Sequence, residues 1–98
     1  MTSKVLKFGA YAPKEIRMVK PILRLRDAIG YKYIFETKSK KYYLSVLLGY
    51  NEAFGFYSNG VDEYEIALMD KNGEFIWIPS NVIGYATNDA VLKILEEN

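Results

Sequence analysis

The segment from Pro13 to Ile29 carries hydrophobic side chains at helical spacing. Its apolar residues follow one another at steps of 4, 3 and 4 and would share one helical face: Met18, Ile22, Leu25 and Ile29. A second face of the same helix would hold the basic residues Lys14, Arg17, Lys20 and Arg24. Because Pro21 disfavours helical geometry at Lys20, the pattern predicts one kinked helix, or a turn followed by a helix that begins at Pro21. The alternation from Leu23 to Arg26 also permits a strand.

A period of two begins at Tyr31 and predicts a β-hairpin. The run Tyr31 to Glu36 is rich in residues that favour strands, and the apolar run Tyr42 to Leu48 follows it. The residues between the two runs form a lysine-rich turn: Lys38, Ser39, Lys40 and Lys41. We interpret this turn as solvated, and a nucleic-acid patch is the alternative interpretation.

A second hairpin is predicted from Tyr64 to Ile78. Its turn is the dipeptide Asn72-Gly73, which favours the positive φ angles of a type I′ turn. The pairs that follow from this turn are Lys71–Glu74, Asp70–Phe75, Met69–Ile76, Leu68–Trp77 and Ala67–Ile78. In this register both faces of the hairpin are apolar. We therefore expect a central strand pair that is covered on both faces, or covered on one face and available to a partner on the other.

The C-terminal segment is predicted to form a short extended piece followed by a helix. The extended piece runs from Val82 to Tyr85. The residues that offer N-cap oxygens at the start of the helix are Thr87, Asn88 and Asp89. The helical spacing of Val91, Ile94 and Leu95 gives the helix an apolar face, so we expect it to cover one face of the sheet.

Four aromatic residues gather between Tyr50 and Gly60 among Asn, Gly and Ser: Tyr50, Phe54, Phe56 and Tyr57. Two interpretations are open. These residues form another short strand that packs into the core, or they form an exposed aromatic patch for a partner.

Together these elements predict one α+β domain over residues 1–98, with an antiparallel β-sheet of hairpins, an N-terminal helical segment and a C-terminal helix. A chain of 98 residues, half of them hydrophobic, is long enough for one core. The sequence has no cysteine, which indicates a reducing compartment, and it has no uninterrupted apolar run of about 18 residues. We therefore expect a cytoplasmic protein that does not span a membrane.

The two charge signs are separated along the chain. Residues 1–41 carry a net charge of +8 and residues 42–98 a net charge of −7, which together give the net charge of +1. Either the two halves face each other and neutralise their charges within the fold, or the basic half forms a functional surface.

Catalytic chemistry has little support in the sequence. The chain contains no histidine and no cysteine, so it lacks the usual general base near neutral pH and the commonest ligands of transition metals. No glycine-rich phosphate loop or dinucleotide fingerprint occurs. A carboxylate site at Asp62, Glu63 and Glu65 remains as a minor alternative. We therefore predict a protein that is not an enzyme and needs no cofactor.

A chain of this kind is expected to act by binding. We predict a protein partner that contacts the basic residues Lys14, Arg17, Lys20 and Arg24, the aromatic residues Tyr50, Phe54, Phe56 and Tyr57, or both sets. Nucleic acid is the alternative partner, because the basic helical face could contact phosphates, and the lysines and tyrosines of Tyr31-Lys32-Tyr33 and Lys40-Lys41-Tyr42-Tyr43 could combine phosphate contacts with base stacking. A homodimer or a purely structural role is compatible with the same features.

The stretch from Gly60 to Glu97 resembles the C-terminal part of small uncharacterised proteins encoded by phages and prophages of low-GC Gram-positive bacteria. The residues that carry the resemblance are Tyr64-Glu65-Ile66-Ala67, Asn72-Gly73, Val82-Ile83-Gly84-Tyr85-Ala86-Thr87, and the helical Val91, Ile94 and Leu95. The resemblance implies no enzyme, cofactor or functional residue. It implies an accessory protein that works by binding a macromolecule of the host or the phage.

Overall fold

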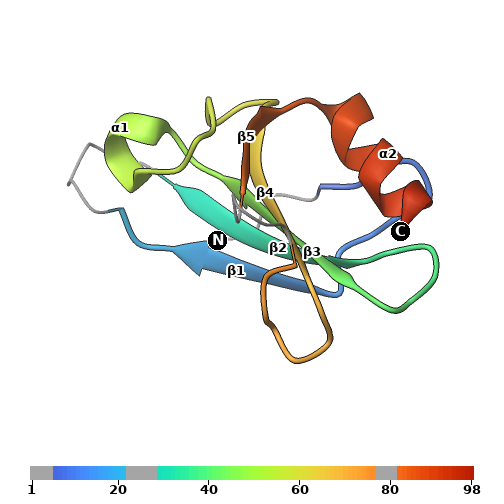
Figure 1. The fold of residues 1–98 in the computed structure, drawn as a ribbon. Helices are drawn as coiled ribbons and strands as arrows, with labels where there is room; N and C mark the ends of the chain where they lie inside the picture. The colour runs from blue at the N-terminus through green and yellow to red at the C-terminus, as the bar shows by residue number, and fades with distance from the viewer. Residues whose placement is uncertain (1–5, 22–28, 77–81) are drawn as a thin grey trace.

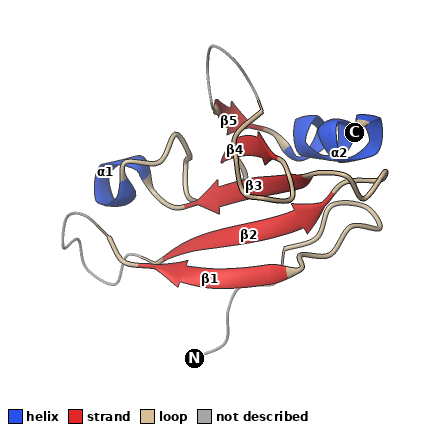
Figure 2. Cartoon of the chain, turned by 60° about the horizontal axis from the view of Figure 1, so that its bottom comes forward, coloured by secondary structure: helices blue, strands red, loops and turns tan. Residues whose placement is uncertain are grey.

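The computed structural model describes residues 6–21, 29–76 and 82–98. These residues form a five-stranded antiparallel sheet in the order β1-β2-β3-β4-β5, so each strand lies beside its neighbour in the sequence. The elements are β1 (Glu15–Val19), β2 (Gly30–Glu36), β3 (Tyr43–Leu48), α1 (Asn51–Phe54), β4 (Tyr64–Met69), β5 (Ile83–Ala86) and α2 (Asn88–Glu97). Figure 1 shows α1 and α2 near opposite ends of the sheet, and Figure 2 shows the strands side by side. The α+β class and the antiparallel sheet are confirmed.

The main core lies between one face of the sheet and α2. Alternate residues of β2 and β3 point into this core and are buried: Tyr31, Tyr33, Phe35, Leu44, Val46 and Leu48. The helix contributes Val91 and Leu95, which have no exposed surface. Burial of one large aliphatic or aromatic side chain contributes roughly 1.5 to 3 kcal/mol. This face therefore supplies most of the hydrophobic stabilisation.

The C-terminal helix begins where the sequence predicts it. The Thr87 side-chain oxygen accepts a hydrogen bond from the Ala90 N–H at 3.3 Å, which makes Thr87 the N-cap of α2. The Tyr64 hydroxyl donates to Oδ1 of Asn88 at 2.8 Å and ties the first turn of the helix to β4. Both the helix and its position over one sheet face are confirmed.

The helix predicted from Pro13 to Ile29 is wrong at Glu15–Val19, which form β1. β1 pairs antiparallel with β2, and Ile16 lies opposite the buried Tyr33. β-Branched residues fit a pleated strand, and pairing with β2 outweighs the helical spacing of the apolar side chains. Residues 22–28 of the predicted helix lie outside the described residues.

The first predicted hairpin is confirmed as β2 and β3, with Glu36 opposite Tyr43. The four residues of the lysine-rich turn are exposed, as a solvated turn requires. Within this turn Lys40 has a positive φ of 63° and donates its N–H to the Thr37 carbonyl oxygen at 2.9 Å.

The second predicted hairpin is wrong in register by one residue. Met69 lies opposite Phe75 rather than Ile76. Because side chains alternate between the two faces, this shift packs Ile76 against the main core and leaves Phe75 50% exposed on the other face. The predicted pairs with Trp77 and Ile78 lie outside the described residues.

The register shift follows from the side chain of Asp70. Its Oδ1 accepts hydrogen bonds from the backbone N–H groups of Asn72 at 2.8 Å and Glu74 at 3.0 Å. These bonds close a three-residue loop in which Gly73 has a positive φ of 86° and Asn72 does not. A three-residue loop of this kind needs only one left-handed residue, so the predicted type I′ turn is wrong.

Candidate functional site

The described basic residues predicted on one helical face lie along the edge strand β1 instead. Arg17 lies in β1 and forms an ion pair with Glu15, while Lys14 and Lys20 flank the two ends of that strand. At about 3.3 Å for each strand residue, the backbones of Lys14 and Lys20 are roughly 20 Å apart. Arg24 lies outside the described residues. The predicted helical face is therefore wrong for Lys14, Arg17 and Lys20, and their contact with a partner stays a prediction.

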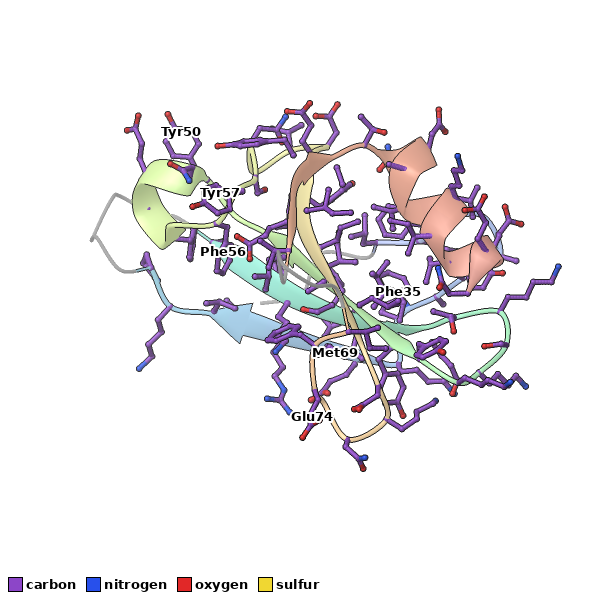
Figure 3. All side chains as sticks on the ribbon, viewed as in Figure 1. Phe35, Tyr50, Phe56, Tyr57, Met69 and Glu74 are labelled. Carbon is purple, nitrogen blue, oxygen red and sulfur yellow. The ribbon has the colours of Figure 1, made fainter. Side chains whose placement is uncertain are left out.

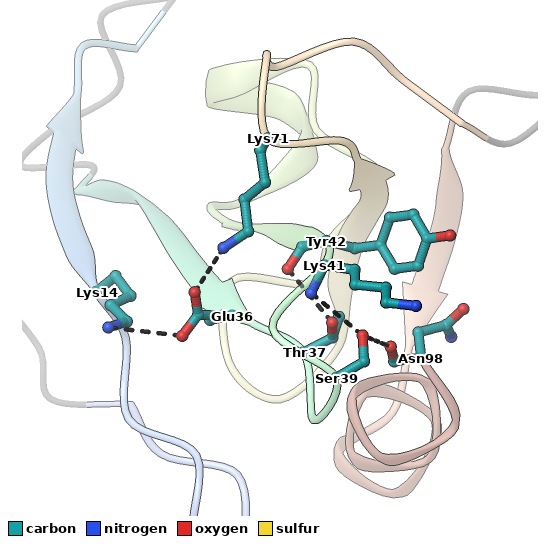
Figure 4. A network of polar contacts seen from close by, with 8 residues as sticks. All are labelled: Lys14, Glu36, Thr37, Ser39, Lys41, Tyr42, Lys71 and Asn98. Carbon is teal, nitrogen blue, oxygen red and sulfur yellow. Dashed lines mark hydrogen bonds and ion pairs between the residues drawn. The ribbon is translucent and has the colours of Figure 1, made fainter.

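A different group of lysines surrounds Glu36 at the end of β2. One carboxylate oxygen of Glu36 lies 3.6 Å from the Lys14 ammonium, and the other lies 2.5 Å from the Lys71 ammonium. Figure 4 shows Lys14 and Lys71 on either side of this carboxylate. The hydrogen bond from Lys71, helped by the charge of Lys14, lowers the pKa of Glu36. The Lys71 ammonium also lies 3.9 Å from the centre of the Tyr43 ring.

Two cavities adjoin this group of lysines. One has a volume of about 490 Å³ and is lined in part by Lys14 and Lys71. The other has a volume of about 370 Å³ and is lined by Lys14, Lys38 and Lys40, with Glu36 as the one carboxylate among its lining residues. Neither Lys38 nor Lys40 forms an ion pair with another described residue. The second cavity therefore has a positive lining.

The lysine-rich turn also has a structural role, because it contacts the C-terminus of α2. The Lys38 N–H donates to the Leu95 carbonyl oxygen at 2.9 Å, and the Ser39 hydroxyl donates to the Asn98 carbonyl oxygen. The last turn of α2 contains no basic residue of its own. Lysines of the neighbouring turn supply positive charge close to the negative end of the helix dipole.

The aromatic segment from Tyr50 to Tyr57 divides into a packed part and an exposed part. Phe54 belongs to α1 and is only 3% exposed, so it is not available to a partner, and it lies in a helical turn rather than the predicted short strand. Its ring stacks on Phe56 with 5.4 Å between centroids. A Cβ atom at Gly30 would lie 2.6 Å from the Phe54 ring, which shows how closely this ring packs against β2. Figure 3 shows the positions of Tyr50, Phe56 and Tyr57.

The exposed part pairs with a residue of β5. Tyr57 is 52% exposed and Tyr85 is 46% exposed, and their ring centroids lie 6.4 Å apart with a tilt of 57° between the planes. We call these two residues the tyrosine pair. Tyr50 is also half exposed and precedes α1. The sequence placed Tyr50 and Tyr57 among the candidate binding residues and missed Tyr85.

The tyrosine pair rests on an irregular part of the sheet. β5 pairs with β4 through a β-bulge in which Gly84 and Tyr85 together lie opposite Glu65. Tyr85 adopts a left-handed backbone conformation with a φ of 53°, and its N–H donates to the Tyr57 carbonyl oxygen at 2.8 Å. A Cβ atom at Gly84 would lie 2.7 Å from the Tyr57 Cβ, so glycine allows the two segments to approach.

Three carboxylates lie in the loop between α1 and β4 and at the start of β4. Oε1 of Glu65 accepts the Tyr57 N–H at 3.1 Å. The side chains of Asp62 and Glu63 both accept from the Asn59 amide, at 2.8 Å and 3.3 Å. These bonds order the loop, and in the described parts of the chain no group of three or more acidic side chains is placed to hold a metal ion. The arrangement suits contact with a positively charged group.

Two features of these surfaces could not be found by sequence reasoning. The left-handed conformation of Tyr85 depends on a bulge between strands, and the only local signal is the glycine that precedes it. The grouping of Lys14, Lys38 and Lys71 around Glu36 joins three separate segments. Of these three lysines only Lys38 is close to Glu36 in the sequence, two residues away.

No protein-family model matches the chain, and neither a curated protein nor a solved structure matches it. Among the described helices, none has the length and apolar character needed to cross a membrane.

Proposed function

We propose that this chain is a non-catalytic accessory protein of phage or prophage type that binds a protein partner through the tyrosine pair. The observation that carries the proposal is Tyr85, a bulky residue held at a φ of 53° with nearly half of its surface exposed. A left-handed conformation costs a residue other than glycine roughly 1 to 2 kcal/mol. Strain of this kind, at a side chain that contributes little to the core, is typical of binding sites.

The chemistry of the two side chains supports the same role. A tyrosine combines a large apolar ring with a polar hydroxyl, and it loses little conformational entropy when it is immobilised. Backbone hydrogen bonds hold Tyr57 and Tyr85 side by side before any partner arrives. This preorganisation lowers the entropic cost of binding.

The proposal is tested by removing the Tyr85 ring without disturbing its backbone. Asparagine tolerates the left-handed conformation, so Tyr85→Asn is the informative variant. Phe75→Asn is the matched control, because it removes a ring of similar exposure, 50%, from the β4 hairpin. Wild type and both variants would serve as bait in a lysate of a Gram-positive host.

We expect a protein that is retained by wild type and Phe75→Asn and released by Tyr85→Asn, while the free energy of unfolding of Tyr85→Asn is not lowered. Retention of the same proteins by all three baits would exclude the tyrosine pair as the contact surface.

A second candidate function is nucleic-acid binding at the cavity of about 370 Å³ that Lys14, Lys38 and Lys40 line. We call it the lysine-lined cavity. This function is favoured by the positive lining of that cavity and by the absence of ion pairs between Lys38 or Lys40 and the described carboxylates. A mobility shift with duplex and single-stranded probes at rising salt tests it. Binding that weakens with salt and disappears in a Lys38→Glu, Lys40→Glu variant would support this function, and affinity weaker than about 1 mM at low salt would end it.

A further inference from the structure

We infer that the tyrosine pair recognises a cationic segment of the partner, in which an arginine or lysine side chain lies against the tyrosine rings and reaches Glu65. This inference rests on the proposed function and names the chemistry of the partner. Three independent observations carry it: the charge of the segments that build the site, the state of the Glu65 carboxylate, and the geometry of the rings.

The segments that build the site are strongly acidic. Residues 57–66, from Tyr57 to the start of β4, contain three acidic residues and no lysine or arginine. Within this stretch Tyr57 and Glu65 are joined by a hydrogen bond, and the acidic side chains of Asp62 and Glu63 belong to the same loop. Lys32 lies on the same sheet face, two strands away from Glu65 with Leu47 between them. The local charge therefore attracts a cation.

The Glu65 carboxylate is only partly satisfied. Its Oε1 accepts the Tyr57 N–H, and no described residue donates to its second oxygen. The side chain is half-buried beside the bulge that carries Tyr85. A carboxylate in such a position forms a stronger hydrogen bond with a charged donor than one in open solvent does.

The rings offer the second part of the contact. With centroids 6.4 Å apart and a tilt of 57°, the two rings do not stack on each other. Both remain about half exposed. A guanidinium or ammonium group within about 6 Å of a tyrosine ring is attracted by the ring quadrupole, and arginine does this more often than lysine. Rings and carboxylate together form a site for a cation.

A second copy of this chain is the competing occupant. The lysine-lined cavity of one molecule has the charge to meet the acidic loop of another, which would give a head-to-tail contact. Such a contact needs Lys38 and Lys40, whereas recognition of a separate cationic segment does not. Sedimentation of the wild type and of the Lys38→Glu, Lys40→Glu variant therefore separates the two occupants.

The test uses synthetic peptides of alternating glycine and arginine, with glycine-lysine, glycine-glutamine and glycine-glutamate peptides for comparison, and measures binding to the full chain by fluorescence anisotropy. We expect the arginine peptide to bind more tightly than the lysine peptide, and no binding of the other two. Tyr85→Asn and Glu65→Gln should each weaken arginine-peptide binding about 3- to 30-fold. Glutamine keeps an acceptor for the Tyr57 N–H, so Glu65→Gln alters the charge and leaves the loop anchored.

Two controls make the result specific. Glu96→Gln removes the same charge from an exposed position on α2, and Phe75→Asn removes a ring elsewhere. Equal losses in Glu96→Gln and Glu65→Gln would overturn the inference, because binding would then depend on net charge alone. Self-association that is lost in both Glu65→Gln and the double lysine variant would also overturn it in favour of a second copy.

Failure of this inference is distinguishable from failure of the proposed function. If no arginine or lysine peptide binds while Tyr85→Asn still releases a specific protein, the cationic partner is wrong and the binding surface stands. If Tyr85→Asn releases nothing, the proposed function itself fails.

Discussion

The backbone N–H of Tyr85 donates to the carbonyl oxygen of Tyr57 at 2.8 Å, which ties a left-handed residue of β5 to the loop after α1. This bond fixes the distance between the two chain segments, and Gly84 allows them to meet without a clash. The two side chains are thereby held outward from the sheet rather than packed in the core. The left-handed backbone of Tyr85 is therefore strained at a position where its side chain is only partly buried.

Replacement of Tyr85 by asparagine is expected to leave the protein as stable as the wild type or more stable. Relief of the left-handed strain should add up to about 1 kcal/mol, which corresponds to a rise in melting temperature of roughly 4 to 8 °C for a domain of this size. Thermal and urea unfolding measure the change. A loss of more than about 1 kcal/mol would show that the ring is a packing residue.

Alanine substitutions should separate the packed and exposed aromatic residues after β3. Phe54→Ala is expected to lower the free energy of unfolding by about 3 to 5 kcal/mol, because it empties a site that is 3% exposed. Tyr57→Ala should cost less than about 1 kcal/mol. Urea denaturation of both variants checks the difference, and similar losses would contradict the division of this segment.

The turn after β4 depends on the Asp70 carboxylate. Asp70→Ala removes the acceptor for two backbone N–H groups and should destabilise the protein by about 1 kcal/mol. Asp70→Asn keeps an acceptor oxygen and should cost less. If the two variants unfold at the same urea concentration, the carboxylate does not set the three-residue loop.

Acidification should destabilise the protein in part through Glu36. The hydrogen bond from Lys71 and the charge of Lys14 lower its pKa from the usual value of 4.5. The folded state therefore binds this proton more weakly than the unfolded state, so the contribution is present above pH 4.5 and is lost as the pH falls through the lowered folded pKa. Urea denaturation between about pH 7 and pH 3 should show a shallower acid loss for Glu36→Gln than for wild type. Glu96→Gln is the control, because it removes an exposed carboxylate that forms no ion pair with another described residue.

Local signals in the sequence correctly predicted part of the fold. Thr87 carries a side-chain oxygen that caps the helix by itself, so the start of α2 could be placed without knowledge of its neighbours. The alternation from Tyr31 to Glu36 likewise identified β2, whose odd-numbered residues are all buried. Both signals act within a few residues of the chain.

Two of the errors lie where residues distant in the sequence decide the outcome, and one, in the turn after β4, has a local cause. Glu15–Val19 form a strand because β2 pairs with them, although apolar spacing favoured a helix. Asp70 overrides the turn type that Asn72-Gly73 favours, through its own side-chain hydrogen bonds. At the candidate site, the sequence pointed to Tyr57 because it lies in an aromatic stretch among Asn, Gly and Ser. Tyr85 was missed, because its position depends on a bulge that only strand pairing creates.

A double-mutant cycle at Tyr57 and Tyr85 tests the central claim most directly. Binding of the captured partner would be measured for Tyr57→Ala, Tyr85→Asn and the double variant, alongside the free energy of unfolding of each protein. We predict that both single variants weaken binding, that the double variant loses less than the two separate losses added together, and that Tyr85→Asn unfolds no more easily than the wild type. Unchanged affinity in both single variants, or affinity losses that simply follow losses of stability, would contradict the account.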